Sequence, residues 1–277
     1  MSASLADSQA SEDYEMRSSM SSEMRRVIYG PVPSWRLGRS LGVDLVSRAE
    51  KTCSFDCVYC QLGCTRHHSA ERREFVPVSR LAGELEELPA LDLDYVTFSG
   101  TAEPTLASNL GEAIDEVKRR IQVPVVVLTN ASLVWQPEVR EALARADRVV
   151  AKLDAPTEEL LTSINRPVEG ITLQKILTGI RALRDEYRGC LALQMMFFEG
   201  NQEEAEALAR LARAMAPDEI EVNTPLRPCG VEPLPPDALA EIMTAFEGLN
   251  AVSVYEAKRP EVRPLDIKET LQRRPVL

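Results

Sequence analysis

The sequence predicts an α/β fold, a partial (βα)6 TIM-like barrel, because strand-like and helix-like segments alternate along it. Such alternation is typical of βαβ units and a parallel sheet. Six units suit an open, partial barrel better than a closed barrel of eight, although the alternation alone also fits a doubly wound sheet. The expected strands cover residues 42–46, 94–98, 124–129, 148–153, 191–198 and 219–224.

Each element has its own local signal. Residues 42–46 (GVDLV) follow turn glycines and are expected to form the first strand. Residues 124–129 (PVVVLT) form a continuous apolar run, which is typical of a strand buried on both faces of a parallel sheet. Residues 172–187 carry apolar side chains at the spacing of one helical face. The expected helices are 79–88, 109–120, 137–146, 172–187, 203–215 and 236–248.

The composition is that of a globular protein with a sizeable core. Of 277 residues, 44% are hydrophobic and 27% charged, and the net charge of −11 argues against a dedicated non-specific nucleic-acid binder. No apolar run is long enough to span a bilayer, and the N-terminus lacks the apolar segment of a secretory signal. We therefore expect a cytoplasmic protein without membrane attachment, whose six cysteines stay reduced.

Three regions are expected along the chain. Residues 1–25 are polar and lack periodicity, so a disordered segment is predicted there. Residues 26–228 are expected to form the catalytic core. Residues 229–277 are expected to form a C-terminal extension that packs on this core.

A cluster of cysteines carries the strongest chemical signal. Cys53, Cys57 and Cys60 have the spacing C-x3-C-x2-C, within the segment KTCSFDCVYCQLGCT. The segment follows the first expected strand, which places it at the carboxyl end of the barrel strands, where barrel enzymes have their active sites. Iron–sulfur clusters usually have four cysteine ligands, so three cysteines would leave one iron open to another ligand.

Two other ligand sets remain open at this point. Cys57, Cys60, Cys64 and either His67 or His68 would suit a zinc site. Alternatively, Cys64 would be a fourth cluster ligand, which would favour electron transfer.

The motif CSFDCVYCQLG resembles the signature of the radical S-adenosylmethionine (SAM) superfamily, with Tyr59 at its aromatic position. The preceding YGPVPSWRLGRSLGVDLV resembles one subgroup, the iron–sulfur oxidoreductases related to wyosine tRNA-base synthases. This resemblance implies a [4Fe–4S] cluster on Cys53, Cys57 and Cys60. It also implies that SAM binds the open iron and is cleaved reductively to a 5′-deoxyadenosyl radical, which abstracts hydrogen from a substrate.

The resemblance extends to the SAM-binding residues. Tyr59 is expected beside the adenine. The segment FSGTAEPT resembles the family's loop for the SAM amino group, with Gly100 and Glu103 at the matching positions and Ala102 where a glycine is usual. An ordinary strand–helix turn is the alternative for this loop.

Polar residues also end two otherwise apolar strands. Asn130 and Asp154 follow the third and fourth expected strands, where inward-facing groups reach a ligand. We expect them to bind the ribose or the carboxylate of SAM. A helix cap is the alternative for Asp154.

The resemblance implies RNA-base modification, with tRNA as substrate and flavodoxin or ferredoxin as electron donor. Archaeal wyosine synthases carry further cysteines before the motif, whereas this chain has none before Cys53, which argues against wyosine synthesis itself. Modification of a protein or a small metabolite, or a non-enzymatic zinc or iron–sulfur module, are the alternatives. Basic residues that would favour an anionic substrate, or simply be solvated, are Arg25, Arg26, Arg36, Arg39, Arg66, Arg72, Arg73, Lys258, Arg259, Arg263, Lys268, Arg273 and Arg274.

Overall fold

A computed structural model of the protein describes residues 25–257 and 259–275. The predicted disordered segment, residues 1–25, lies almost wholly outside this range, as does Lys258. In the described part of the chain, no helix has the length and apolarity needed to cross a bilayer.

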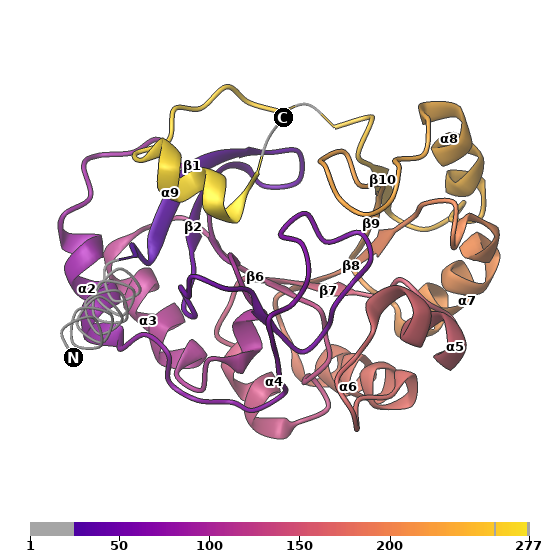
Figure 1. Cartoon of the computed structure of the whole chain (residues 1–277), viewed down its shortest axis with the longest axis horizontal. Helices are drawn as coiled ribbons and strands as arrows, with labels where there is room; N and C mark the ends of the chain where they lie inside the picture. Colours follow the sequence, from indigo (N-terminus) through magenta and orange to yellow (C-terminus); the bar gives the residue numbers. More distant parts are fainter. Residues whose placement is uncertain (1–24, 258, 276–277) are drawn as a thin grey trace, which may run out of the picture.

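One curled sheet of eight strands forms the centre of the molecule (Figure 1). β1 pairs with β2 antiparallel, and every later neighbour in the sheet is parallel. Helices cover its convex face, so the predicted partial barrel is confirmed. In sheet order the strands are β1 (Ile28–Ser34), β2 (Gly38–Val43), β5 (Tyr95–Phe98), β6 (Val125–Thr129), β7 (Arg148–Lys152), β8 (Cys190–Met196), β9 (Glu219–Asn223) and β10 (Ala251–Ser253).

The outer helices match the sequence prediction closely. Each buries one apolar face against the sheet, as in α6, where Leu173, Ile176 and Ile180 are buried. The outer helices are α2 (Val78–Glu86), α3 (Leu110–Arg120), α4 (Pro137–Leu143), α6 (Leu173–Glu186), α7 (Ala205–Met215) and α8 (Pro236–Thr244). A short α5 (Glu158–Leu160) continues into a π-helical turn over Leu161–Asn165.

The prediction for the first strand was wrong. The strand expected at residues 42–46 is β2, which covers Gly38–Val43 and follows an additional strand, β1. Two prolines in β1 hid this strand, but proline is tolerated at a sheet edge because no neighbour needs its missing N–H group. The β1–β2 turn packs against the central sheet, where Leu37 contacts Val126, Val150 and Ala192.

The C-terminal residues return to the first strand. Helix α9 (Ile267–Arg273) lies beside β1 although more than two hundred residues separate them (Figure 1). The hydrogen bond that Gly30 N–H donates to the Thr270 side-chain hydroxyl (Oγ1, 3.1 Å) joins the two elements. Strand β10 extends the central sheet beyond residue 228 by pairing with β9. The expected boundary between core and C-terminal extension stays a prediction.

Candidate functional site

The cysteine segment forms a loop at the carboxyl end of β2. Its base is closed by two short parallel strands, β3 (Thr52–Cys53) and β4 (His67–His68). The Lys51 carbonyl accepts hydrogen bonds from the N–H groups of Arg66 (3.1 Å) and His67 (3.0 Å). These contacts close the base of the loop, which lies inside the curl of the sheet (Figure 1).

The three motif cysteines line one cavity. Cys53, Cys57 and Cys60 are all half-buried, and they surround a space of about 240 Å³ together with Gly100 and Glu103. A turn closed by the bond from Cys60 N–H to Cys57 O (3.1 Å) carries the second and third of them. The predicted cysteines and the predicted SAM loop therefore face the same space.

The electrostatics of this cavity suit thiolate ligands. Burial raises the pKa of the Cys57 thiol to about 11 and raises that of Cys53 as well, so free thiols there are neutral. Burial acts to lower the pKa of Lys51, but its interactions with Cys60, Cys53 and Cys57 outweigh burial and raise that pKa. A metal deprotonates a coordinating thiol outright, and the Lys51 ammonium would then balance part of the thiolate charge. The donor set thus fits an iron–sulfur cluster.

The alternative zinc site is not formed. Among residues 25–257 and 259–275, no three His, Cys, Asp or Glu side chains converge on a point that would hold one ion. His67 contacts Glu50 (3.1 Å), and His68 Nε2 lies 3.1 Å from the Ser54 carbonyl oxygen. Cys64 is exposed. An iron–sulfur cluster would not need such convergence, because Cys53, Cys57 and Cys60 would not all bind one ion.

Glu103 ties the loop after β5 to the end of β6. Its Oε1 accepts hydrogen bonds from Thr105 N–H (3.1 Å), Thr105 Oγ1 (2.7 Å) and Thr129 Oγ1 (2.6 Å). Its Oε2 accepts one, from Asn130 N–H (2.7 Å), and burial raises the pKa of this carboxyl group. Oε2 can therefore accept a further hydrogen bond, and the Glu103 side chain that carries it lines the cavity.

Asn130 links this loop to the cysteines. Its side-chain amide donates to Ser54 Oγ (2.9 Å) and lies 3.5 Å from Cys53 Sγ. Ser54 also shares a hydrogen bond of 2.6 Å with Ser132, so the segment after β6 holds the first motif cysteine from one side.

Asp154 contacts the cysteine loop through Tyr59. Its carboxylate accepts hydrogen bonds from the Tyr59 hydroxyl, from Asn165 Nδ2 (3.0 Å) and from Met196 N–H (2.8 Å). Lys152 Nζ lies 3.3 Å from the same carboxylate and 4.9 Å from the centre of the Tyr59 ring. Asp154 thereby fixes the aromatic residue of the motif.

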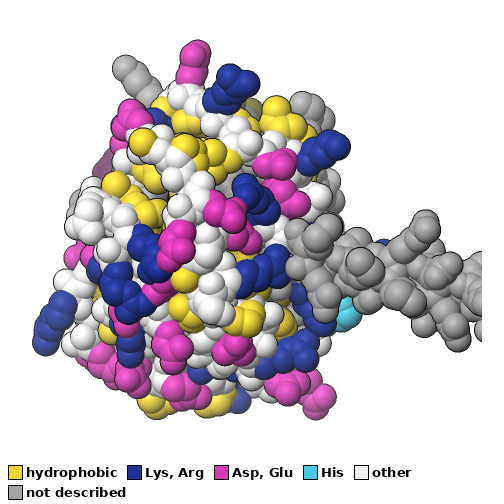
Figure 2. Space-filling view, turned by 90° about the vertical axis from the view of Figure 1, so that its left-hand side faces the viewer, with side chains coloured by type: hydrophobic (Ala, Val, Ile, Leu, Met, Phe, Trp, Pro, Cys, Tyr) yellow, Lys and Arg dark blue, Asp and Glu magenta, His cyan; other side chains and the backbone are white. Residues whose placement is uncertain are grey.

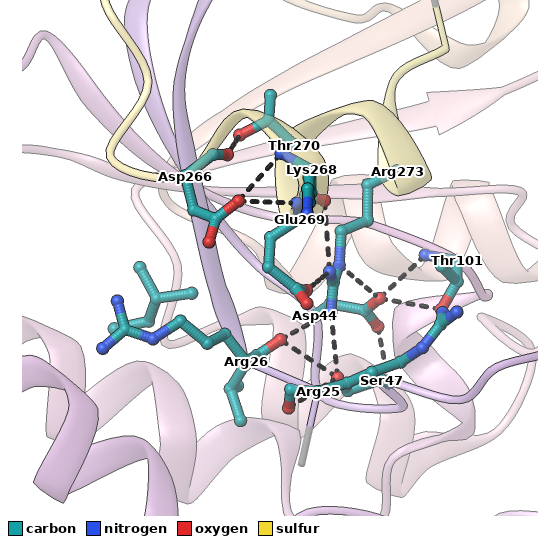
Figure 3. Close-up of polar contacts among 12 residues, drawn as sticks. Arg25, Arg26, Asp44, Ser47, Thr101, Asp266, Lys268, Glu269, Thr270 and Arg273 are labelled. Atoms are coloured by element: carbon teal, nitrogen blue, oxygen red, sulfur yellow. Dashed lines mark hydrogen bonds and ion pairs between the residues drawn. The ribbon is translucent and has the colours of Figure 1, made fainter. Parts of the chain in front are cut away.

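A buried ion pair fixes the loop at Gly100 and Thr101. Asp44, just after β2, accepts hydrogen bonds from Thr101 N–H (3.0 Å) and Thr101 Oγ1 (2.7 Å) (Figure 3). Arg273 of α9 lies 3.3 Å from the same carboxylate, and its side chain is fully buried. The alternative that Arg273 is a solvated charge was wrong, because this pair buries its side chain.

Sequence reasoning missed several of these supporting residues. Asp44 and Arg273 are 229 positions apart, so no local pattern connects them. Asn165 reaches the Tyr59 hydroxyl (2.8 Å) from the π-helical turn, a contact that only the fold brings about. The lysine two positions before Cys53 was visible, but only the fold shows that Lys51 is buried against the cysteines.

Comparison with protein families matches residues 51–212 to the Radical SAM superfamily. A UPF0026 protein of Synechocystis is 43% identical over 202 residues, which is 73% of this chain and 76% of that protein. A UPF0026 protein of Methanocaldococcus jannaschii is 36% identical over 230 residues, 79% of this chain and 71% of that protein. A rice S-adenosyl-L-methionine-dependent tRNA 4-demethylwyosine synthase is 25% identical over 129 residues, 47% of this chain and 19% of that protein.

Solved structures agree with the fold. Streptococcus suis SuiB, crystallised with its precursor peptide SuiA, superposes with a TM-score of 0.60 at 15% identity over 78% of this chain. This chain spans only 49% of SuiB, so the likeness concerns the fold alone.

The fold, the cysteine loop and these matches together define the class: the chain belongs to the radical SAM superfamily. Within that superfamily it is a member of the UPF0026 family. It is therefore an enzyme that uses a [4Fe–4S] cluster and SAM and that needs a reductant.

Proposed function

We propose that Cys53, Cys57 and Cys60 hold the cluster and that the enzyme abstracts hydrogen from its substrate. When bound, the cluster and SAM supply the chemistry, an electron that cleaves a sulfonium bond and yields a 5′-deoxyadenosyl radical. The observation that carries the proposal is the shared cavity, in which the three half-buried thiols face Gly100 and Glu103.

The protein side chains would bind and orient SAM. Glu103 Oε2 retains capacity for the amino group, and Asn130 lies beside Cys53 in the same cavity. We assign Tyr59 to the adenine, and its position in the lining of the cavity supports this assignment. For Asp154 the contacts favour a supporting role toward Tyr59 rather than contact with the ribose or carboxylate of SAM, because its oxygens already accept bonds from the protein.

Two substrate classes suit this chemistry. RNA-base modification on tRNA is supported by the distant similarity to the rice tRNA 4-demethylwyosine synthase. Modification of a small metabolite is supported by a partly open cavity that continues from the cysteines, and we favour it. Flavodoxin or ferredoxin is the proposed reductant. We also propose that the enzyme works in the reducing cytoplasm, because its thiolates must stay reduced.

Cluster assembly tests the ligand assignment. After anaerobic reconstitution with iron and sulfide, we expect about four irons per chain and an EPR signal of the reduced cluster that changes when SAM is added. Cys57→Ser should lose both, whereas Cys190→Ser, the matched control away from the loop, should keep them. Full iron content and an unchanged signal in Cys57→Ser would contradict the proposal.

A further inference from the structure

A second cavity continues from the cysteine cavity into the curl of the sheet. Its volume is about 290 Å³, and the two cavities share Tyr59, Cys60 and Lys152 among their lining residues. Ligand sites for small molecules begin at about 300 Å³, so this space is of the right size for a small substrate. Its position places that substrate next to the proposed SAM site.

Five arginines line this second cavity; Arg273 is paired with Asp44, and the other four come from distant parts of the chain. Arg36 comes from the β1–β2 turn, and Arg227 follows β9. Arg259 lies in the segment between β10 and α9, and Arg274 directly follows α9. We call these four residues the arginine quartet.

The quartet is poorly neutralised by the protein. Arg36 is paired with Glu221 at 3.0 Å. Arg227 donates to the side-chain oxygen of Gln61, and Arg274 donates to the Pro33 carbonyl oxygen (2.6 Å), so both partners are neutral. Within residues 25–257 and 259–275, no carboxylate forms an ion pair with Arg227, Arg259 or Arg274.

The guanidinium groups repel one another. Burial, followed by the charges of Arg274, Arg259 and Arg36, lowers the pKa of Arg227 to about 9. Burial lowers the pKa of Arg274 to about 10, and Arg36 and Arg259 add to this effect. Both groups stay charged at neutral pH. Half-buried cations without a counter-charge are costly, and an anionic ligand would relieve that cost.

We propose that the quartet binds the phosphoryl group of a phosphorylated small molecule, which is the substrate of the radical reaction. This inference rests on the proposed function. Guanidinium groups match phosphate geometry through paired N–H donors, and a phosphate dianion would balance two of the charges. The substrate carbon that loses hydrogen would then lie toward Tyr59 and Lys152, where the two cavities meet.

The distribution of charge favours a small molecule over RNA. The quartet gathers around one cavity rather than over a broad surface. On the face shown in Figure 2, Lys and Arg side chains alternate with Asp and Glu instead of forming a continuous basic patch. The net charge of −11 would also oppose the approach of a long polyanion.

Binding of inorganic phosphate to the reconstituted, SAM-loaded enzyme, measured by calorimetry, tests this inference. We expect Arg227→Gln and Arg274→Gln each to raise the Kd for phosphate about tenfold or more. Arg188→Gln, an exposed arginine in the loop before β8, should bind like the wild type. Thermal unfolding confirms that each variant is folded. Two quartet variants are used so that the test still stands if one of them does not fold. Equal affinity in all four proteins would overturn the proposal.

Two further ligands distinguish the sources of negative charge. Malonate, a dicarboxylate, should bind at least about tenfold more weakly than phosphate; equal affinity would overturn the phosphoryl assignment. A short single-stranded RNA that binds more tightly than phosphate and competes with it would overturn the small-molecule assignment. The proposed function is judged separately, by SAM cleavage in wild-type enzyme without phosphate.

Discussion

Single residues hold the SAM loop in place through close contact. Gly100 has a φ of +147°, and a Cβ atom there would lie 2.4 Å from Cγ of Asp44. Asp44 in turn binds the backbone of Thr101. The close approach of Asp44 therefore requires a glycine at position 100, the position that the family resemblance also singled out.

Gly100→Ala should raise the Kd for SAM about tenfold or more, because the methyl group displaces Asp44 and with it the loop. Equilibrium dialysis with labelled SAM measures this. The control is Gly83→Ala in α2, where a Cβ atom meets nothing within 4 Å, and helix propensity should stabilise the fold by about 0.5–1 kcal/mol. Unchanged SAM affinity in Gly100→Ala would show that the loop does not contact SAM.

Lys51 places a positive charge beside the motif cysteines. Its ammonium donates to the Gly63 carbonyl oxygen (3.0 Å) and is buried. We expect Lys51→Met to lower the reduction potential of the cluster, since the added electron loses a favourable charge. An EPR-monitored potential titration measures the shift, and Lys51→Arg should restore much of it. A potential that does not move in Lys51→Met would exclude this role.

At the scale of the elements, helix α9 secures the proposed site from a distance. Arg273 joins it to Asp44, to Ser47 Oγ (3.0 Å) and to the Arg26 carbonyl oxygen (Figure 3). Arg273→Met should lower the free energy of unfolding by about 3–5 kcal/mol, because the buried Asp44 loses its counter-charge. Urea denaturation measures this change.

Two comparisons separate charge from general damage to α9. Lys268→Met on the same helix, where the side chain is exposed, should change stability by less than about 0.5 kcal/mol. Adding Asp44→Asn to Arg273→Met should recover part of the loss. If Arg273→Met were as stable as Lys268→Met, the buried pair would have no structural importance.

Asp94 joins the start of β2 to the start of β5 and gives the sheet a pH dependence. It accepts hydrogen bonds from Arg39 N–H (2.7 Å) and from the Arg39 guanidinium (2.8 Å), which lower its pKa from 3.8 to about 2. A lowered carboxyl pKa gives stability that is complete above pH 3.8 and is lost as the pH falls toward 2.

Asp94→Asn should therefore destabilise the protein at pH 5 and make less difference as the pH decreases below 3.8. Urea denaturation over this range, with Asp185→Asn as the control at an exposed carboxylate away from Arg39, measures the difference. A constant difference between wild type and Asp94→Asn at every pH would show that the carboxyl charge is not responsible.

At the scale of the whole molecule, the local patterns predicted most of the architecture. The apolar run at Val125–Thr129 and the stripe on α6 gave the correct type and position of their elements. The cysteine spacing and the polar strand ends also identified residues that meet in one region. These features are periodic or closely spaced along the chain, so they can be recognised in the sequence alone.

The remaining features depend on contacts between distant segments. The β1–β2 hairpin was missed because its prolines are acceptable only at an edge, and the sequence does not reveal which strand is an edge. Arg227 was not singled out, since one arginine after a strand carries no signal without Arg259 and Arg274 beside it. The sequence likewise could not separate the buried Arg273 from the partly exposed Arg274 that follows it.

Formation of 5′-deoxyadenosine tests the central claim most directly. Reconstituted enzyme given dithionite and SAM under anaerobic conditions should produce it, and chromatography quantifies it. We predict that Cys57→Ala abolishes the product, whereas Cys190→Ala retains it. Product that forms equally in wild type and Cys57→Ala, or is absent from a wild type that carries a full cluster and binds SAM, would contradict the account.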